Sequence, residues 1–402
     1  MTRKIEKSKA NGVVSAPTSK SMAHRLLICA SLSKGKSVIN GITSCEDVLA
    51  TIDCLRALGA EIEYDGQKAV VCGVDFSAVA PSEPLFSRES GSTLRFLIPL
   101  ALLTGKETVF CGSEKLISRP QSVYEEIASR NGFTFKKEND KIIVKGNLKG
   151  GEYPIRGDVS SQFITGLLFA LSTLKEDSRI VITTKLESKS YIDLTISAMA
   201  EFGVKVVFEN DSTLFIEGGQ SYLPREITVE GDWSGTAFIE AFNHIGGNVT
   251  VNGLKESSLQ GDKVYRDYFN SIDNGFCEIN IDNCPDLGPI LFTLAAIKHG
   301  GIFTGTKRLK IKESDRAEAM KTELSKFGAE LVIEENSVTV KECELQSPGE
   351  RLYGHNDHRI VMSLAVISTL FGGEIEGCEA VSKSYPAFFE DITKLGIKTY
   401  ET

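Results

Sequence analysis

The sequence contains the stretch Leu55-Arg-Ala-Leu-Gly59-Ala-Glu-Ile-Glu63, in which apolar residues at helical spacing lead to a glycine and alternating apolar residues follow. This order is typical of a helix that ends at a left-handed glycine and continues into a half-exposed strand. The same order recurs at Gly132, Gly203, Gly328 and Gly396, and in a weaker form at Gly275. The intervals between successive glycines are 73, 71, 72, 53 and 68 residues, so the stretch is one copy of an internal repeat.

A second kind of helix lies between successive copies of that stretch. It begins with small polar or charged residues, stays apolar for about three turns and leads through a turn into a strand. Its six copies begin near Ser19, Gly91, Ser160, Ser234, Asp286 and Asp357. Two helices with their strands, repeated six times, account for nearly the whole chain and predict an α/β (α+β) fold of six βαβαββ units.

The composition is that of a globular protein. The chain has 402 residues, of which 41% are hydrophobic and 25% charged, and this balance excludes a disordered chain. At roughly 150 residues per domain, the length predicts two or three domains. The longest apolar stretch, Phe96 to Leu103, is too short to span a membrane, and the N-terminus lacks the apolar core of a secretory signal.

Charge and cysteine content argue against several further classes of protein. The chain has 45 Lys and Arg against 54 Asp and Glu, a formal charge of −9, and no long basic run, which argues against a nucleic-acid coat. Its nine cysteines include no CxxC pair, which favours free thiols in a reducing compartment over disulfides or a structural zinc site. We therefore expect a cytoplasmic protein.

The polar beginnings of the second helix set indicate anion binding. Exposed N–H groups and the positive end of the helix dipole favour anions there, although ordinary N-capping explains any single case. Basic residues shift the balance towards a ligand. Lys20 and Ser21 fall in the first expected turn of their helix and Arg25 about one turn later, where a cation is unfavourable unless an anion binds.

Other helix beginnings carry comparable groups. Gly91, between Arg88 and Arg95, would let the backbone approach a ligand closely. In Arg119-Pro120, the proline fits the first position of a helix.

Uncharged and acidic side chains open three further helices. The cluster Ser160-Ser161-Gln162 suits a phosphate or hydroxyl groups, but a capping arrangement explains it equally well. Ser188 enters a helix from a polar loop, and Asp286 precedes the apolar run Leu287 to Ile297. Because aspartate is a common N-cap, spacing alone does not make Asp286 a general base.

The densest charge cluster is Lys307-Arg-Leu-Lys-Ile-Lys312-Glu-Ser-Asp-Arg316. Its alternation predicts a strand followed by a helix beginning, and a solvated edge strand explains it as well as a binding site does. The segment His355-Asn-Asp357-His358-Arg359 places three titratable groups before another helix, but its spacing completes no zinc motif. Finally, Ser382-Lys383-Ser384 repeats the Ser-Lys-Ser order that begins at Ser19.

Taken together, these motifs resemble those of the 5-enolpyruvylshikimate-3-phosphate synthases, the 3-phosphoshikimate 1-carboxyvinyltransferase family. The matching segments are Ser19–Arg25, Glu89–Arg95, Ser118–Pro120, Ser160–Gln162, Ile311–Arg316, Asn356–Arg359 and Ser382–Pro386. Each motif alone is weak, but they occur in family order over the whole chain, and as a set they are specific.

The resemblance implies a two-domain fold. Each domain would contain three βαβαββ units in an inside-out α/β barrel, six repeats in all, with the active site in the interdomain cleft. One domain would be discontinuous, made of residues 1–17 and 233–402. The other would comprise residues 18–232.

The resemblance also implies a reaction. The enolpyruvyl group of phosphoenolpyruvate would pass to the 5-hydroxyl of 3-phosphoshikimate by addition and elimination, with release of phosphate, as the sixth step of the shikimate pathway. The family uses no metal and no organic cofactor. Its partners are these small molecules, with no nucleic acid and no membrane, and its members are commonly monomers.

The family's substrate contacts can be carried over residue by residue. The resemblance assigns phosphoenolpyruvate binding to Lys20, Gly91, Arg119, Gln162, Arg316, Arg359 and Lys383. It assigns 3-phosphoshikimate binding to Ser21, Arg25, Ser160, Ser161, Gln162, Ser188, Asp286 and Lys312. Asp286 would take the proton of the 5-hydroxyl, and either Glu313 or Lys20 would deliver a proton to the methylene carbon.

One residue departs from the family pattern, and two other functions stay in competition. Glu89 stands where many members have Asn before the pocket glycine, which leaves sensitivity to the inhibitor glyphosate open. A related enzyme transfers enolpyruvyl to UDP-N-acetylglucosamine and typically carries a reactive cysteine, but the corresponding stretch Gly112 to Arg119 contains none. The other competing function is that of a non-catalytic repeat protein that binds an anion.

Overall fold

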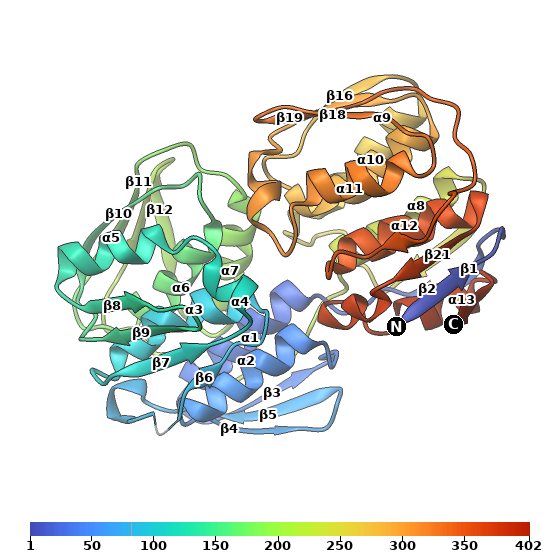
Figure 1. The fold of residues 1–402 in the computed structure, drawn as a ribbon. Coiled ribbons are helices and arrows are strands. Elements are labelled where there is room, and N and C mark those ends of the chain that lie inside the picture. Colours follow the sequence, from blue (N-terminus) through green and yellow to red (C-terminus); the bar gives the residue numbers. More distant parts are fainter. Residues whose placement is uncertain (82) are drawn as a thin grey trace. The chain divides into compact units, whose positions relative to one another are not determined.

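The computed structural model describes residues 1–81 and 83–402. The chain folds into two compact units (Figure 1). Unit 1 comprises Met1–Pro17 and Gly231–Thr402, and unit 2 comprises Thr18–Glu230. The first strands of the chain are therefore completed by its C-terminal half.

Unit 2 is built around three apolar helices that begin where the sequence predicts. These are α1 (Lys20–Leu32), α3 (Gly91–Leu103) and α6 (Ser161–Leu171), whose side chains are nearly all buried. Around them lie α2 (Glu46–Ala57), α4 (Glu114–Ser118), α5 (Ser122–Asn131) and α7 (Lys189–Glu201), with a 3₁₀ turn η1 at Phe76–Ala78. At the end of α5, Gly132 adopts the left-handed conformation that the repeat predicts.

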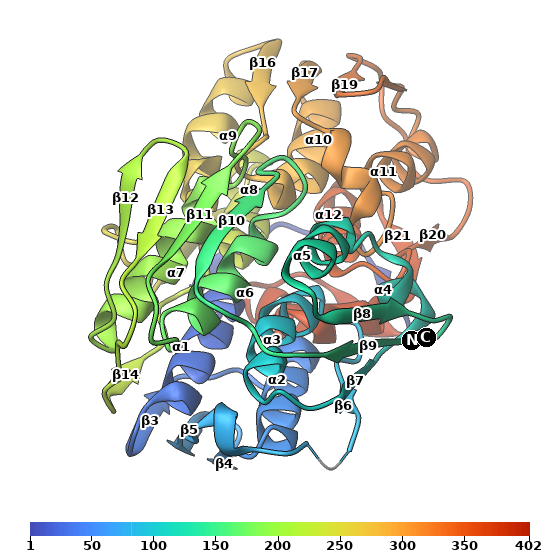
Figure 2. The ribbon, with the colours of Figure 1, turned by 90° about the vertical axis from the view of Figure 1, so that its left-hand side faces the viewer.

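Three four-stranded sheets lie on the outside of these helices (Figure 2). Their strand orders are β14-β3-β5-β4, β6-β7-β9-β8 and β10-β11-β13-β12. The strands are β3 (Lys36–Asn40), β4 (Glu61–Tyr64), β5 (Lys68–Cys72), β6 (Leu85–Phe86), β7 (Thr108–Cys111), β8 (Thr134–Lys137), β9 (Lys141–Lys145), β10 (Gly151–Ile155), β11 (Ser178–Ile182), β12 (Val206–Asn210), β13 (Thr213–Ile216) and β14 (Glu226–Thr228). In each sheet the first pair is parallel and the other pairs are antiparallel, as where Ile180 lies opposite Tyr153 and Leu214.

Unit 1 repeats this plan with its own buried helices. These are α8 (Trp233–His244), α10 (Gly288–Ile297) and α12 (His358–Phe371). The shorter helices are α9 (Tyr265–Asp273), α11 (Arg316–Ser325) and α13 (Phe388–Lys394), and the 3₁₀ segments are η2 (Gly261–Val264), η3 (Pro285–Leu287), η4 (Lys307–Ile311) and η5 (Cys378–Lys383).

The sheets of unit 1 are not all alike. Two have four strands, in the orders β16-β17-β19-β18 and β20-β21-β1-β22, and the third pairs only β15 with β2. The strands are β1 (Thr2–Ile5), β2 (Asn11–Ser15), β15 (Asn248–Asn252), β16 (Cys277–Asn280), β17 (Gly301–Thr304), β18 (Leu331–Ile333), β19 (Ser337–Val340), β20 (Leu352–Tyr353), β21 (Gly373–Glu376) and β22 (Thr399–Glu401).

The two-stranded sheet explains the weak copy of the repeat. After α9 and Gly275 the chain passes directly into β16, which is the first strand of the next sheet, so no hairpin follows the helix here. The missing hairpin accounts for the interval of 53 residues before Gly328, where the other intervals are 68 to 73. The mixed α/β prediction is confirmed, and the fourth repeat differs from the predicted βαβαββ order by these two strands.

Close helix packing in unit 2 requires a glycine at one position. A Cβ atom on Gly166 of α6 would lie 2.5 Å from the Arg95 carbonyl oxygen and 3.2 Å from the Cα of Phe96. Because both atoms belong to the backbone of α3, a side chain there would push the two helices apart. The contact brings the first turns of α3 and α6 together, where the candidate site lies.

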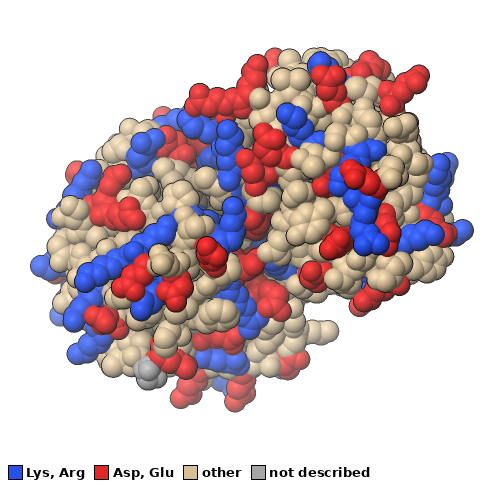
Figure 3. Space-filling view, in the orientation of Figure 1, with Lys and Arg blue, Asp and Glu red and all other residues tan. Residues whose placement is uncertain are grey.

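The surface carries both signs of charge on each unit, on the face that Figure 3 shows. Among residues 1–81 and 83–402, no helix combines the length and apolar character needed to cross a membrane.

Candidate active site

Serine side chains cap the three central helices of unit 2. Ser19, Ser90 and Ser160 accept hydrogen bonds from backbone N–H groups in the first turns of α1, α3 and α6. These are ordinary N-caps, which the sequence analysis gave as the alternative to anion binding. What distinguishes the three beginnings is the set of basic and amide side chains that they carry.

Arg25 on α1 is a buried cation. Its Nε donates to the Thr195 hydroxyl at 2.9 Å, and its Nη atoms donate to the carbonyls of Ser21 at 2.6 Å and Tyr191 at 2.9 Å. Burial lowers the pKa of Arg25 to about 10, so the guanidinium stays charged near neutral pH. Because its partners in the described chain are neutral oxygens, its positive charge is available to an anion.

Lys20 lies in the first turn of α1 and pairs with a residue that the sequence did not point to. Its Nζ donates to Asp47 Oδ2 of α2 at 2.9 Å. The Ser21 side chain is half-buried beside it in the same turn. The first turn of α1 therefore carries an ammonium group and a hydroxyl, as the sequence predicts.

Gly91, Arg119 and Gln162 come together although 71 residues separate the first from the last. A Cβ on Gly91 would lie 2.9 Å from Arg119 Nη1 and 3.7 Å from Gln162 Oε1. Gln162 in turn accepts from Arg95 Nη1 at 2.8 Å and donates to the Ser92 hydroxyl at 3.0 Å. The hydrogen bond between Arg95 and Gln162 ties α3 to α6, a role that sequence analysis missed because it joins residues far apart in the chain.

The loop that carries Arg119 differs from its prediction. Arg119 follows α4, and α5 begins only at Ser122 after the cap residue Gln121, so Pro120 precedes the helix instead of occupying its first position. Pro120 instead offers its carbonyl to Arg95 Nη2 at 3.0 Å. The remaining predicted serines lie at helix beginnings: Ser161 opens α6, and Ser188 precedes α7 with a left-handed backbone, φ 56°.

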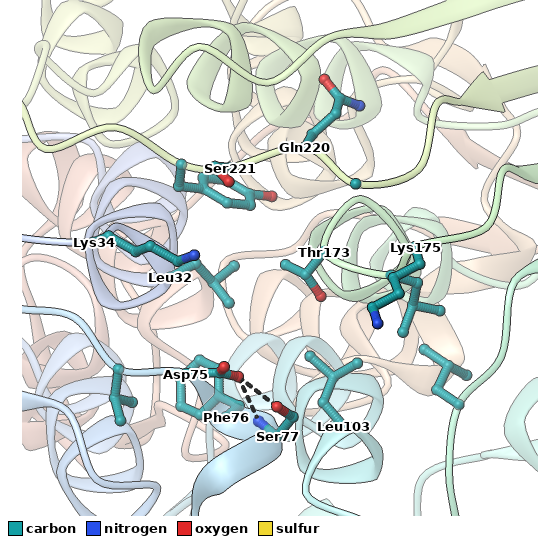
Figure 4. Close-up of a pocket in the computed structure, with 15 residues that line it drawn as sticks. Leu32, Lys34, Asp75, Phe76, Ser77, Leu103, Thr173, Lys175, Gln220 and Ser221 are labelled. Carbon is teal, nitrogen blue, oxygen red and sulfur yellow. Dashed lines mark hydrogen bonds between the residues drawn. The ribbon is translucent and has the colours of Figure 1, made fainter.

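A cavity of about 380 Å³ in unit 2 lies elsewhere (Figure 4). Its lining includes Leu32 and Leu103, the last residues of α1 and α3, and the lysines Lys34 and Lys175. Because Leu32 and Leu103 end their helices, this cavity lies at the opposite end of the helices from the candidate site.

In unit 1, three cationic side chains surround the carboxylate of Asp286. Its Oδ1 accepts from Arg316 Nη1 at 2.7 Å and from Lys312 Nζ at 3.2 Å, and its Oδ2 accepts from Arg359 Nη2 at 3.1 Å. The Asp286 side chain keeps 20% of its surface exposed. We call these four residues, with Glu313 and Asp357, the unit 1 cluster.

The charge state of Asp286 follows from its neighbours. Burial alone would raise the pKa of its carboxyl, but Arg359, Lys312 and Arg316 outweigh burial and hold the pKa well below its usual range. The carboxylate is therefore ionised at neutral pH. Burial also lowers the pKa of Lys312, while Asp286 opposes that shift.

Arg316 is the most enclosed member of the unit 1 cluster, with 1% of its side chain exposed. Besides Asp286, it donates to Asp357 Oδ2 at 2.8 Å through Nε and to Glu313 Oε2 at 2.8 Å through Nη2. Burial would lower its pKa, but Asp357, Glu313 and Asp286 raise it well above its ordinary value. Asp357 also caps α12, accepting from the Arg359 N–H at 2.9 Å, so one carboxylate fixes both arginines.

The predicted strand at Lys307 is wrong. Residues Lys307–Ile311 form the 3₁₀ segment η4, in which the Leu309 N–H donates to the Thr306 carbonyl at 2.9 Å. Arg308 is buried and donates to the Asp282 carbonyl, which holds the segment in a turn. Basic and apolar residues are therefore buried side by side in this turn, as Arg308 and Leu309 show, and Lys312 and Glu313 follow it.

Lys383 lies at the end of η5, and its Nζ donates to the Asn356 carbonyl at 2.6 Å. Asn356 and His355 both have left-handed backbones, with φ values of 51° and 50°. Such strain is common beside functional groups, and here it immediately precedes Asp357.

Metal ligands and a surface charge pair complete the description of the two units. In the described part of the chain, no group of three or more His, Cys, Asp or Glu residues could hold a metal ion. Arg88, which follows β6, pairs with Glu46 and with Asp53 of α2, the latter at 2.7 Å.

Comparisons with known proteins identify the family of the chain. A family model described as EPSP synthase (3-phosphoshikimate 1-carboxyvinyltransferase) matches residues 5–392. The chain is 41% identical over 415 residues to a 3-phosphoshikimate 1-carboxyvinyltransferase of Clostridium perfringens, covering 98% of this chain and 97% of that protein. A protein of the same name from Clostridioides difficile is 40% identical over 424 residues, with 98% and 97% covered.

Solved structures share the fold at lower identity. An EPSP synthase from Acinetobacter baumannii superposes with a TM-score of 0.80 at 21% identity, covering 100% of each chain. The enolpyruvyl transferase NikO from Streptomyces tendae gives 0.79 at 14%, covering 100% of this chain and 98% of that one. The family model and the relatives near 40% identity extend over nearly the whole chain, and we conclude that the chain belongs to the EPSP synthase family.

Proposed function

We propose that the protein is a 3-phosphoshikimate 1-carboxyvinyltransferase, which moves the enolpyruvyl group of phosphoenolpyruvate to the 5-hydroxyl of 3-phosphoshikimate and releases phosphate. The observation that carries the proposal is the unit 1 cluster in a member of this family: one carboxylate, Asp286, held by Lys312, Arg316 and Arg359. A base and several fixed cations are what this transfer between two phosphorylated carboxylates requires.

Charge balance supports these substrates. Two phosphorylated carboxylates carry about five to six negative charges together near neutral pH, because the second ionisation of a phosphate monoester falls near 6. Buried or partly buried cations such as Arg25, Arg119, Arg316 and Arg359 can offset that charge in a low-dielectric setting.

The proposed substrate contacts are those of the family. Phosphoenolpyruvate would bind Lys20, Gly91, Arg119, Gln162, Arg316, Arg359 and Lys383. For 3-phosphoshikimate the residues would be Ser21, Arg25, Ser160, Ser161, Gln162, Ser188, Asp286 and Lys312. The absence of a side chain on Gly91 leaves room for a ligand atom beside the Arg119 guanidinium, which supports its place in the first set.

The chemistry begins with an addition. The 5-hydroxyl oxygen forms a bond to C2 of phosphoenolpyruvate, Asp286 takes the hydroxyl proton, and the methylene carbon gains a proton from Glu313 or Lys20. The bond from C2 to the phosphate oxygen then breaks, and phosphate leaves with that oxygen and the bonding electron pair. The new methyl group returns a proton to the deprotonated Glu313 or Lys20, which restores the double bond. Lys312, 3.2 Å from Asp286 Oδ1, would stabilise negative charge as it develops on the attacking oxygen.

Binding of the donor would also prepare the base. A carboxylate whose pKa is held well below its usual range accepts a proton poorly. When the anionic groups of phosphoenolpyruvate neutralise Arg316 and Arg359, the main forces that lower the Asp286 pKa are offset. We therefore expect Asp286 to become an effective base only in the ternary complex.

Release of phosphate from phosphoenolpyruvate tests the proposal. Turnover is expected with 3-phosphoshikimate, and not with UDP-N-acetylglucosamine or without an acceptor. Turnover with the nucleotide sugar alone would replace the acceptor, and folded protein without turnover would favour the anion-binding alternative.

The quaternary state and the cellular compartment also belong to this proposal. We expect a monomer that works in the cytoplasm. Light scattering during size-exclusion chromatography, with and without both substrates, would measure the molar mass and test the monomeric state. A stable dimer would contradict it.

A further inference from the structure

Asp262 is a buried carboxylate outside the predicted site. It lies in η2, in the segment Ser258-Leu-Gln260-Gly-Asp262, with 3% of its surface exposed. Its Oδ2 accepts a hydrogen bond from the Ser234 hydroxyl in the first turn of α8, and its Oδ1 is buried without a hydrogen-bond partner among the described residues. A buried carboxylate oxygen of this kind needs an explanation, because leaving it unsatisfied is costly.

The position of Asp262 is fixed from the backbone upward. Gln260 accepts from the Trp233 N–H at 3.1 Å and donates to the Gly231 carbonyl at 2.8 Å, which locks η2 to the beginning of α8. The nearest lysine in sequence, Lys263, directs its ammonium group to the Ser258 carbonyl at 3.0 Å. The position of Asp262 is thus fixed, and the ammonium group of Lys263 in the same segment is directed to a carbonyl instead of to the Asp262 carboxylate.

The same helix, α8, also packs against elements that carry the unit 1 cluster. η2, η3 and α12 each pack against α8, and the Arg359 guanidinium lies 5.8 Å from the ring centre of Phe238 in that helix. Asp262, Asp286 and Arg359 are therefore brought to one place by three elements that share a neighbour. No motif in the sequence suggested this arrangement.

The charged and titratable groups around Asp262 shift its pKa in both directions. Burial, Asp286 and Asp232 raise the pKa of Asp262, Arg359 and Ser234 lower it, and the net result is a pKa of about 6. Cys284 before η3 and Tyr268 of α9 also respond to the negative charge of Asp262, since it raises the pKa of each. Interaction between two titrating groups is mutual, so an ionised Asp262 also makes Asp286 hold a proton more strongly.

We propose that Asp262 is a positioning residue for the transfer reaction: its buried carboxylate, on a segment that packs against α8 as η3 and α12 do, adapts Asp286 to act as a base. This inference rests on the proposed function. Three cations make Asp286 a weak base, and Asp262 offsets part of their effect without touching substrate. Ionised Asp262 supports the base, and protonated Asp262 does not.

The pH dependence of kcat distinguishes this role from a structural one. Asp262→Asn keeps the shape of the side chain and an acceptor for the Ser234 hydroxyl but removes the charge. We expect kcat to fall about ten-fold above pH 7, with KM values changed less than about two-fold, because only the proton affinity of the base changes. The ratio of wild-type to variant kcat should approach one below about pH 5, where Asp262 is already neutral in the wild type. Using the ratio cancels the titration of the substrate phosphates.

A matched control and a stability measurement complete the test. Asp267→Asn, five residues further on the exposed side of α9, should leave kcat and its pH profile unchanged. Because Asp262→Asn removes a charge that is unfavourable when buried, its melting temperature above pH 6 should equal or exceed that of the wild type. A lower melting temperature with a kcat ratio that is constant over pH would show a structural role instead.

The outcomes separate this inference from the proposed function. A kcat ratio of one at every pH in an active wild type would overturn the role of Asp262 alone. If the wild type has no turnover, the proposed function fails and the catalytic role of Asp262 fails with it. The melting curves still test whether the buried charge of Asp262 destabilises the fold. Identical curves for the wild type and Asp262→Asn would contradict that destabilisation as well.

Discussion

At the residue scale, the main feature is the Asp286 carboxylate, which is paired with three cations. Arg316, Lys312 and Arg359 contact its two oxygens, and under the proposed function the anionic groups of the donor would use two of the same cations, Arg316 and Arg359. Arg316 remains fixed by Asp357 and Glu313 when Asp286 is released from it. Under the proposed function, the site would exchange its internal anion for the anions of the donor without losing the position of Arg316, its most buried cation.

Asp286→Asn tests the base directly. The amide keeps the shape of the side chain but cannot accept the hydroxyl proton, so kcat should fall by about 10²- to 10⁴-fold with a smaller change in KM. Phosphate release under saturating substrates measures it, with Asp267→Asn as the control. A rate within a few-fold of wild type would remove Asp286 from the role of base.

Gly91→Ala tests the space beside Arg119. Gly91 has an ordinary backbone conformation, so alanine should fold there, but its Cβ would lie 2.9 Å from Arg119 Nη1 and displace the guanidinium. We expect KM for phosphoenolpyruvate to rise roughly ten-fold with kcat changed less, which corresponds to about 1.4 kcal/mol of binding.

Gly349→Ala is the control for this substitution, since a Cβ there meets nothing within 4 Å. If Gly91→Ala left KM for phosphoenolpyruvate unchanged, Gly91 would not line the donor site.

Sequence patterns located most of these residues but not their partners. Helix beginnings with polar and basic residues pointed to Lys20, Gly91 and Asp286 because capping and dipole effects are local. Asp47, which pairs with Lys20, and Asp262, which acts on Asp286, lie in other elements. Such contacts depend on the packing of helices, which a single sequence does not determine.

At the element scale, the approach of α3 to α6 matters most. Gly166 allows the contact, and the hydrogen bond between Arg95 and Gln162 crosses it at 2.8 Å in the first turns. The same turns carry Gly91 and the cap Ser160. Packing in the helix interior and the geometry of the candidate site are therefore linked.

Gly166→Ala should weaken this link. A Cβ 2.5 Å from the Arg95 carbonyl would push against backbone, and overpacking of this kind destabilises by about 1–3 kcal/mol. Urea unfolding measures the loss, and kcat/KM should fall with it because Gln162 moves.

Gly288→Ala, at the beginning of α10, is a matched helical control, since its Cβ would meet side chains at an ordinary 3.4 Å. Equal stability of the two variants would contradict the packing argument.

Two elements were predicted wrongly for physical reasons. The alternation over Lys307–Ile311 is also compatible with a tight turn, and the buried Arg308 decides for the turn by donating to the Asp282 carbonyl. Pro120 fits a first helical position by its fixed φ, but the chain uses its carbonyl for Arg95 and begins α5 two residues later. In both cases a distant partner overrides the local preference.

At the scale of the whole molecule, the repeat determined the fold class from sequence alone. Regular glycine intervals predicted alternating helices and strands, and five sheets have the predicted four strands. The short interval of 53 residues carried the information that one hairpin is missing, which only the pairing of β15 with β2 makes plain.

The pH dependence of stability should reflect two carboxyl groups, Asp286 and Asp262, whose pKa values are shifted in opposite directions. The pKa of Asp286 lies well below its usual range, so its ionisation stabilises the fold above about pH 4, and this contribution is lost as the pH falls. The pKa of Asp262 is raised to about 6, so its ionisation destabilises the fold progressively between about pH 4 and about pH 6.

Calorimetry on the two Asn variants checks these signs. Asp286→Asn should melt a few degrees below wild type above about pH 5, at about 2–4 °C per kcal/mol, and the difference should shrink at lower pH. Asp262→Asn should show the opposite sign above pH 6. Differences that do not vary with pH would contradict both assignments.

The measurement that tests the account most directly is phosphate release from phosphoenolpyruvate in the presence of 3-phosphoshikimate. We predict turnover that requires this acceptor, fails with UDP-N-acetylglucosamine and is lost in Asp286→Asn. Folded protein that releases no phosphate with 3-phosphoshikimate, or releases it equally without an acceptor, would contradict the proposed function.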